Sequence, residues 1–134
     1  MKLTHACGYA IHAVAYLAKQ KEDHLVASRH IAEAQGLPER FLVKVLKPLV
    51  SAQVLLSLRG PNGGYRLARP ARTITLLEIV EAVEGPIRGQ VPLLDARNGE
   101  DRFTRRLEAV CSETADLVRQ RLQKVRLSDL AGKA

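Results

Sequence analysis

The chain has 134 residues, of which 46% are hydrophobic and 26% are charged, as in one ordinary globular domain. Its two cysteines are too few for a disulfide scaffold or for a structural zinc site of four thiolates. No stretch reaches the roughly 18 apolar residues of a membrane span, and no secretory signal opens the chain. We therefore expect a cytoplasmic protein with no membrane partner.

The positive charge is concentrated in one half of the chain. The formal net charge is +7, from 21 Lys and Arg against 14 Asp and Glu. Residues 1–72 hold 11 basic and 4 acidic side chains, whereas residues 73–134 hold 10 of each. This asymmetry favours a polyanion-binding unit joined to a second functional part. Solubility through net charge is the alternative explanation.

Apolar periodicity predicts three helices in the basic half. The first covers about residues 3–19. The second is short, with Ser28 as its expected N-cap and Gly36 as its terminating residue. The third follows Pro38, and Pro48 is expected to end or bend it near Lys47. Two short helices joined by a Gly-Leu-Pro turn are typical of a helix-turn-helix.

Two β-prone runs follow the third helix, at residues 54–58 and 65–68. The stretch between them is rich in glycine, which allows positive φ angles and a tight hairpin. Basic residues flank the hairpin tip on both sides. A hairpin placed directly after a helix-turn-helix is interpreted as a wing.

The neutral half is predicted to hold a short helix, a loop and a long helix. Thr75 is expected to cap the short helix through about Val83, with Glu78 completing a capping box. The loop covers residues 85–99 and the long helix about 101–126, which at 1.5 Å per residue would measure ~39 Å. This length favours a partner helix, and packing on its own domain is the alternative. The expected dimerisation residues are Phe103, Leu107, Val110, Thr114, Leu117, Val118 and Leu122.

Residues 57–68 closely resemble the wing signature of the Rrf-two family of bacterial winged helix-turn-helix regulators, the IscR and NsrR type. The opening Met-Lys-Leu-Thr and the closing Leu-Ser-Asp-Leu at 127–130 are also similar to the family's pattern. One departure is Ala52-Gln53, where the family usually has Ala-Gly. The resemblance implies a mainly α fold with a small β-hairpin wing. It implies a DNA-binding region at 1–72, a connecting helix and loop at 73–100, and a dimerisation helix and tail at 101–134.

The resemblance implies a regulator that binds double-stranded DNA sequence-specifically, as a homodimeric repressor on a near-palindromic operator. An enzyme is disfavoured, because no catalytic constellation has motif support and the glycine-rich stretch lacks the Lys-Ser/Thr of a phosphate loop. A dimerising adaptor that no longer binds DNA is a further alternative. The retained Lys44, Arg59 and net positive charge of residues 1–72 oppose it.

In such folds the third helix enters the major groove and the wing follows the adjacent minor groove. Arg40 is expected to contact guanine or, equally well, a phosphate or solvent, and Val43 to contact a thymine methyl. By its place in the wing motif, Arg59 corresponds to an arginine inserted into the minor groove. Phe41 and Tyr65 are interpreted as half-buried supports. The expected DNA-binding residues are Ser28, Arg29, Arg40, Val43, Lys44, Lys47, Arg59, Gly60, Asn62, Gly63, Gly64 and Tyr65.

Many relatives hold an iron–sulfur cluster on three cysteines in the loop before the long helix. Residues 85–99 contain no cysteine, which excludes a cluster of that kind. In a rarer arrangement of the family, His12 and Cys111 match two ligand positions, but Gly8 replaces the carboxylate. Another metal could use His5, His12 and Cys111 across a dimer. We expect no cofactor, with Cys111 as a small core hydrophobe at the dimer seam and His12 as a hydrogen-bonded interface residue.

Thiol chemistry and effector binding are the other ways to sense a signal. Cys7 lies on the apolar stripe of the first helix, where burial would raise its pKa and quiet it. It could pair with Cys111 only if the fold brings their Cα atoms within about 7 Å. A small effector or a protein partner at residues 85–99 is the third possibility.

Overall fold

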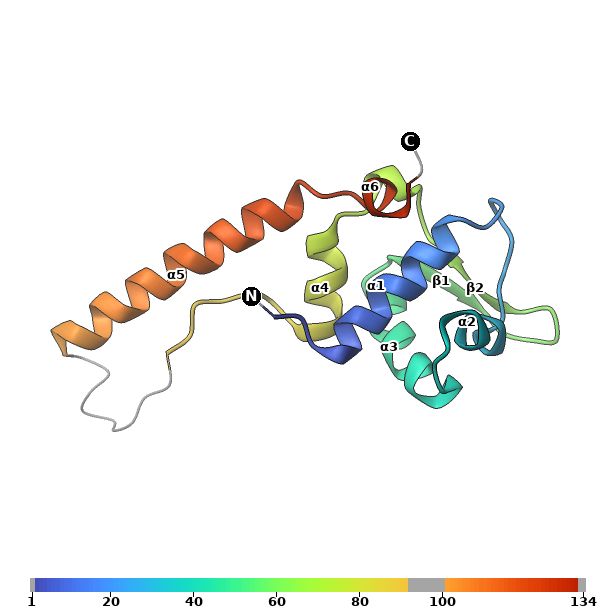
Figure 1. Ribbon diagram of the computed structural model, residues 1–134, viewed down its shortest axis with the longest axis horizontal. Helices are drawn as coiled ribbons and strands as arrows, with labels where there is room; N and C mark the ends of the chain where they lie inside the picture. The colour runs from blue at the N-terminus through green and yellow to red at the C-terminus, as the bar shows by residue number, and fades with distance from the viewer. Residues whose placement is uncertain (1, 92–100, 133–134) are drawn as a thin grey trace.

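The computed structural model describes residues 2–91 and 101–132 (Figure 1). It is mainly helical with one two-stranded antiparallel sheet, as expected. In chain order the elements are α1 (His5–Ala18), α2 (Ser28–Gln35), α3 (Glu39–Ser51), β1 (Leu55–Leu58), β2 (Gly64–Leu67), the 3-10 helix η1 (Ala71–Thr73), α4 (Leu76–Glu84), α5 (Arg102–Gln123) and α6 (Leu127–Ala131). No helix in these two ranges is long and apolar enough to cross a membrane.

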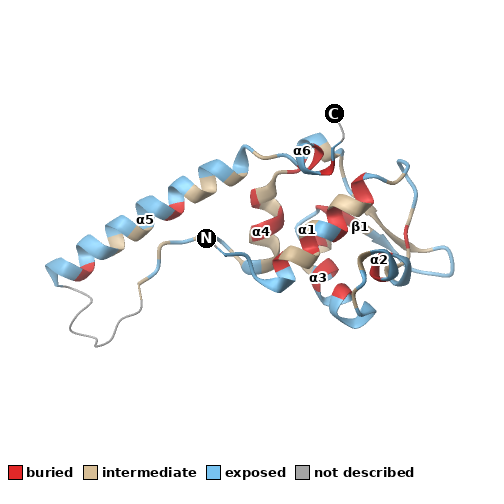
Figure 2. Ribbon diagram, in the orientation of Figure 1, coloured by how far each residue is buried: buried red, intermediate tan, exposed pale blue. Residues whose placement is uncertain are grey.

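Helix α1 is the centre of the core. Its first turn is capped by Thr4, whose Oγ1 accepts a hydrogen bond from the backbone N–H of Cys7 at 3.1 Å. Apolar residues at helical spacing make one side of α1 fully buried, and α3, α4 and α6 pack around it (Figure 2). The largest side chains that complete this core are Ile31, Leu42, Leu46, Leu49, Leu55, Ile74, Ile79 and Leu127.

The helix-turn-helix has the expected turn but a different beginning. Gly36 ends α2 in the left-handed region at φ 66°, and Leu37 N–H bonds to the Ala32 carbonyl at 2.9 Å. Ser28 is not the N-cap, because the helix already includes it and Ala27 takes that position without a side-chain bond. The Ser28 hydroxyl donates instead to Glu39 Oε1 at 2.8 Å, which joins the starts of α2 and α3.

Pro48 was expected to end or bend α3 near Lys47, and it does not end it. The helix continues to Ser51, with Pro48 inside it. A proline in a helix removes one backbone hydrogen bond. Burial of Leu46 and Leu49, on either side of the proline, outweighs this loss because both side chains are fully enclosed in the core.

The wing is a hairpin extended by a third segment. Strands β1 and β2 pair antiparallel, from Leu55 opposite Leu67 to Leu58 opposite Gly64. Val26, in the connection between α1 and α2, forms a bridge to Tyr65, with reciprocal N–H to O bonds of 2.9 and 2.8 Å. The half of the wing next to its turn is therefore held by backbone bonds to the segment that precedes α2.

The short helix α4 begins as predicted, with Thr75 and Glu78 forming a complete capping box. The long helix α5 ends at Gln123 rather than near 126, so its length is about 33 Å. Backbone bonds explain the early end: Leu76 N–H donates to the Val125 carbonyl, and Leu127 N–H to the Ile74 carbonyl, both at 2.8 Å. The chain then turns into α6, which packs on α1 and η1.

Candidate nucleic-acid interface

Helix α3 presents a row of cations opposite its buried stripe. Arg40, Lys44 and Lys47 are all exposed, and Val43 between them is exposed as well. Within the described ranges none of the three cations forms an ion pair. Their spacing of three or four residues places them on one side of the helix. This side therefore presents uncompensated positive charge to any approaching polyanion.

Phe41 was expected to be a half-buried support, and the structure contradicts this. Its side chain is 53% exposed at the start of α3. The buried stripe of the helix begins at Leu42, so Phe41 lies one residue, or about 100°, away from it. Tyr65 of β2 is half-buried, as expected, and its backbone forms the bridge to Val26.

The wing tip exposes Arg59, Gly60 and Asn62. Gly60 has a φ of 113°, and its carbonyl accepts the N–H of Gly63 at 2.9 Å, which closes the turn. A side chain at Gly63 would collide with the Leu58 carbonyl. These glycines are therefore required by the turn itself, whatever contacts the wing makes with a ligand.

Gly64 has a separate reason to be glycine. Its φ is 155°, and a Cβ there would lie 2.5 Å from the Val26 carbonyl oxygen. The close approach allows the bridge between residue 26 and the wing. Gly64 is among the expected DNA-binding residues, whereas the structure shows that internal packing already demands a glycine here.

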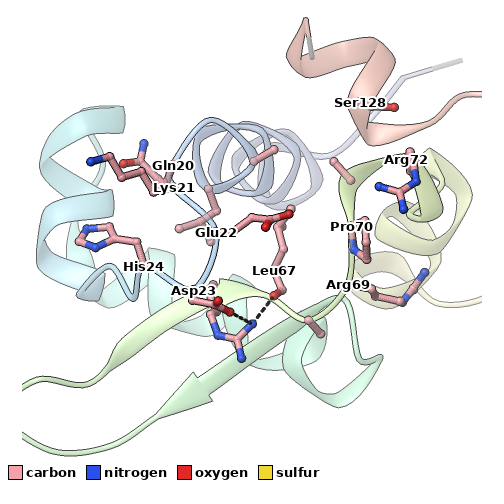
Figure 3. Close-up of a pocket in the computed structure, with 15 residues that line it drawn as sticks. Gln20, Lys21, Glu22, Asp23, His24, Leu67, Arg69, Pro70, Arg72 and Ser128 are labelled. Atoms are coloured by element: carbon pink, nitrogen blue, oxygen red, sulfur yellow. Dashed lines mark hydrogen bonds and ion pairs between the residues drawn. The ribbon is translucent and has the colours of Figure 1, made fainter. Parts of the chain in front are cut away.

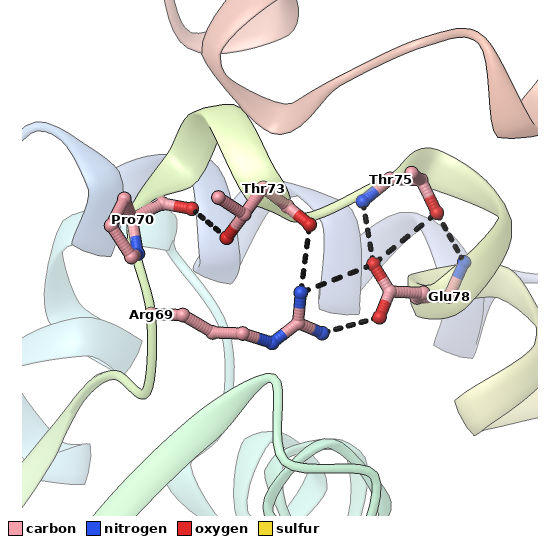
Figure 4. Close-up of polar contacts among 5 residues, drawn as sticks. All are labelled: Arg69, Pro70, Thr73, Thr75 and Glu78. Atoms are coloured by element: carbon pink, nitrogen blue, oxygen red, sulfur yellow. Dashed lines mark hydrogen bonds and ion pairs between the residues drawn. The ribbon is translucent and has the colours of Figure 1, made fainter.

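Arg69, which follows the second strand of the wing, is engaged within the protein (Figure 4). Arg69 forms an ion pair with Glu78, and its Nη1 donates to the Thr73 carbonyl at 2.7 Å. Burial works to raise the pKa of Glu78, but hydrogen bonds from Thr75 and Arg69 outweigh it and hold the pKa below its ordinary value. Arg69 therefore joins the end of the wing to α4, a role that its sequence neighbourhood did not reveal.

Ser28 and Arg29 lie in the first turn of α2, whose leading N–H groups have no acceptor within the helix. Arg29 is exposed, and Ser28 is half-buried and bonded to Glu39. The expected contact residues thus lie on three elements: the start of α2, the outer side of α3, and the wing tip. Helices α2 and α3 pack on each other, and the bridge from Val26 to Tyr65 ties the wing to this pair.

Helix α5 projects from the body of the molecule and is exposed along most of its length (Figures 1 and 2). Its exposed residues include a row of apolar side chains. Phe103, Val110 and Leu117, each seven residues apart, are 74%, 58% and 65% exposed. Leu107 and Thr114 lie between them on the same side and are exposed too. We call these five residues the α5 seam.

The opposite side of α5 faces its own chain. Thr104 and Ala115 are buried there, and Arg119 Nη1 pairs with Glu81 Oε2 of α4 at 2.7 Å. Val118 and Leu122 also belong to the expected dimerisation set. They are half-buried within the single chain, whereas the seam residues are exposed. The sequence pattern did not separate these two sides.

A helix-turn-helix with unpaired cations on its second helix, followed by a β-hairpin, defines a winged helix-turn-helix domain. The family model of Rrf2, described as iron-dependent transcriptional regulator, matches residues 3–133, so this chain belongs to the Rrf2 family. The family and the relatives named for a role are transcriptional regulators, not enzymes.

Curated relatives match through part of the chain. It is 43% identical over 84 residues to protein aau3 of Rhizobium meliloti, covering 63% of this chain and 54% of the relative. It is 34% identical over 87 residues to a protein of Mycobacterium tuberculosis named as an HTH-type transcriptional regulator, covering 65% and 54%. The match thus spans about half the length of these relatives.

Solved structures match over nearly the whole chain. CymR of B. subtilis, titled the global cysteine regulator, is 28% identical with a TM-score of 0.77, covering 98% of this chain and 97% of that one. The oxidised form of Staphylococcus aureus CymR is 27% identical with a TM-score of 0.72, covering 100% and 98%. IscR of T. potens is 26% identical with a TM-score of 0.72, covering 98% and 87%.

The family description raises the question of iron, and the residues that the structure describes offer no donor set that fits a cluster. Cys7 is fully buried among apolar side chains, and burial, followed by the nearby Glu84 charge, raises its thiol pKa to about 11. A thiol held protonated is a poor metal ligand. In the part of the chain that the structure describes, no three His, Cys, Asp or Glu side chains gather in a group that could hold a metal.

The three expected sensor residues lie on two elements. His5 and His12 are exposed on α1, and the His5 ring lies 6.2 Å from the Tyr9 ring between centroids. Cys111 is half-buried on α5, where the backbone of Gly89 lies directly against its own. Residues 92–100 lie outside the described ranges. Of the segment 85–99, which was expected to bind an effector or a protein partner, the structure therefore describes only residues 85–91.

Proposed function

We propose that this protein is a cytoplasmic homodimer that binds a near-palindromic operator in double-stranded DNA and represses transcription by occluding the promoter. The observation that carries the proposal is the set of exposed cations on α3 and the wing. Arg40, Lys44, Lys47 and Arg59 have no ion-pair partner in the described chain, whereas Arg66 and Arg69 have one. Four uncompensated cations on these two elements favour binding of a polyanion.

Helix α3 is the element we assign to the major groove. A guanidinium at Arg40 can donate two parallel bonds to guanine, whereas the lysines act as point charges and suit phosphates. Val43 and the exposed Phe41 beside them offer apolar surface to thymine methyl groups. The N–H groups at the start of α2 suit a further phosphate.

The wing is the element we assign to the minor groove. Arg59 directly follows β1 at the tip of a hairpin whose second strand is bridged to residue 26 at Tyr65. A·T-rich DNA has a narrow minor groove with concentrated negative potential, which attracts an inserted arginine. Arg59 would therefore read groove shape rather than base edges.

The α5 seam supports the dimer. A row of apolar residues at heptad spacing on a projecting helix buries itself well against a second copy of the same helix. A two-fold axis through this seam would present two copies of α3 and two wings, which matches a near-palindromic operator. Symmetry would also double the basic surface that meets the DNA.

Replacing Arg59 by Ala tests the wing assignment. We expect affinity for DNA from the protein's own promoter to fall about ten-fold, and more when the flanks are A·T-rich than when they are G·C-rich. Fluorescence anisotropy titrations with both flank types measure this. Arg105→Ala, which removes an exposed arginine from α5, is the matched control and should bind like the parent. Equal affinity of the Arg59 and Arg105 variants for A·T-rich sites would contradict the assignment.

A further inference from the structure

The two flanks of the α5 seam differ in what covers them. On one flank lies the chain's own segment 87–91, in which half-buried and exposed residues alternate. The backbone of Gly89 meets that of Cys111 so closely that a Cβ on Gly89 would lie 2.2 Å from the Cys111 carbonyl carbon. Thr104 and Val118, each seven residues from Cys111, lie on the same covered flank and are buried and half-buried. A partner therefore finds the seam open from the other flank.

The open flank carries one positive and one negative side chain. Arg106 and Glu113 are both exposed, and neither has an ion-pair partner in the described ranges. At about 100° per residue, both lie about 60–80° around the helix from the line of the seam. They are therefore placed to meet whatever packs on the seam without belonging to its apolar row.

Ion pairs elsewhere in the described chain join neighbouring elements. Arg66 Nη1 of β2 lies 3.6 Å from Asp23 Oδ1 in the turn after α1 (Figure 3), and Arg119 of α5 pairs with Glu81 of α4. Arg106 and Glu113 are two helical turns apart, about 10 Å along the helix, which is too far for them to pair with each other. A second molecule can supply the opposite charge that each of them lacks.

Two copies of the seam can pair parallel or antiparallel, and the covered flank distinguishes these arrangements. In a parallel pair the two-fold axis runs along the helices, so the open flank of each copy faces the covered flank of the other. In an antiparallel pair the axis crosses the helices, so open flank faces open flank. Segment 87–91 obstructs a parallel pair on both sides, whereas an antiparallel pair can close along its open flanks.

The length of the seam determines the register of an antiparallel pair. The row runs from Phe103 to Leu117, so the pairing that buries all of it has its two-fold axis at Val110, the middle residue. Arg106 lies four residues before Val110, and Glu113 lies three residues after it on the same flank. The axis therefore brings each Arg106 within about one residue, or about 1.5 Å along the helix, of the partner's Glu113.

We propose that this protein recognises a second copy of itself by antiparallel pairing of the α5 seam, with two reciprocal ion pairs between Arg106 and the partner's Glu113. The inference rests on the proposed homodimer and adds its orientation, its register and the charges that make it selective. Phe103 packs near the partner's Leu117, and Val110 packs against its own copy. A long helix of another protein with different charges on this flank leaves these two unpaired or repelled, which disfavours mixed dimers.

Charge reversal tests the ion pairs. Arg106→Glu sets two carboxylates against each other at both contacts, and Glu113→Arg sets two guanidinium groups against each other. We expect either variant to raise the dissociation constant of the dimer about ten-fold in sedimentation equilibrium. Both changes in one chain restore opposite charges, and so does a mixture of the two single variants, so each should recover the affinity of the parent. Arg105→Glu, on the far side of α5 from the seam, is the matched control and should not alter the dimer.

Cross-linking tests the orientation, in chains that all carry Cys111→Ser. Antiparallel pairing places residue 103 beside the partner's residue 117 and about 21 Å from the partner's residue 103. A short bismaleimide should therefore join Phe103→Cys chains to Leu117→Cys chains in a mixture and should join neither variant to itself. Cys7 is fully buried and should not react.

The outcomes separate this inference from the homodimer on which it rests. A parent chain that stays monomeric at every concentration would contradict the homodimer itself. A dimeric parent whose affinity is unchanged by both charge reversals would overturn the ion pairs, as would a mixture of the single variants that stays as weak as either alone. Cross-linking of Phe103→Cys chains to one another would overturn the antiparallel orientation.

Discussion

At the scale of single residues, the structure separates charges that are engaged from charges that are free. Arg69 and Glu78 join the wing to α4, and the bond from Ser28 to Glu39 joins two helix starts. Arg40 and Arg59 have no such partner in the described chain. Net charge along the sequence treats these arginines alike, although only the unpaired ones can bind DNA without first losing an internal contact.

Cys7 makes stability depend on pH in the alkaline range. Its pKa is raised from 9.0 to about 11, so the folded thiol stays protonated while the unfolded thiol ionises. The contribution of the protonated Cys7 thiol to the free energy of unfolding is therefore complete below pH 9 and is lost as the pH rises toward 11. We expect the destabilisation caused by Cys7→Ala, from urea unfolding, to shrink by about 2 kcal/mol between about pH 8 and pH 10.5.

The variant Cys7→Val provides a check on this prediction. It also removes the titrating thiol but fills more of the buried space than Ala does. Its unfolding free energy, measured relative to the parent, should change with pH by the same amount as that of Cys7→Ala. A difference from the parent that stays constant with pH in both variants would show that the folded thiol ionises normally.

At the scale of elements, α5 has two sides with different tasks. One side packs on its own chain through Ala115 and the Arg119–Glu81 ion pair. The other side is the α5 seam, which remains apolar and exposed in the single chain. A helix of about 33 Å that projects from the body in this way is suited to pair with a second copy.

Leu117→Glu tests the seam. A charge at this end of the seam would have to lose its hydration in a dimer, so we expect the variant to sediment as a monomer at concentrations where the parent is a dimer. Ala109→Glu adds the same charge to an exposed position of α5 off the seam and should remain dimeric. Identical sedimentation of the two variants would contradict the assignment of the seam.

Most elements could be predicted from the sequence because their signals are local. The capping box at Thr75 and the left-handed Gly36 depend on neighbouring residues, and both are confirmed. The errors came from contacts distant along the chain. The core carries α3 past Pro48, and backbone bonds between the segments around residues 75 and 126 end α5 early.

The candidate site was less predictable than the fold for the same reason. Which arginine is free depends on partners elsewhere in the sequence, as Arg69 and Glu78 illustrate. The exposure of Phe41 depends on how α3 is rotated against the core. The identities of the proposed DNA-contacting residues remain predictions from the wing motif and the pattern of α3.

At the scale of the whole molecule, the uneven charge of the sequence corresponds to a division of the structure. The net charge of +7 belongs to residues 1–72, which form the helix-turn-helix and wing, while the neutral half supplies the seam. Binding DNA through lysines and arginines releases counterions, so affinity must fall steeply with salt. A homodimer that makes about 6–10 phosphate contacts should follow this rule.

The most direct test is the affinity of the intact protein for DNA from its own promoter, measured against salt by fluorescence anisotropy. We predict a linear fall of log affinity with log salt, amounting to about three to five orders of magnitude between about 50 and 200 mM. We also predict much weaker binding to a shuffled duplex of the same composition. Equal binding to both duplexes, or an affinity that does not change with salt, would contradict the proposed function.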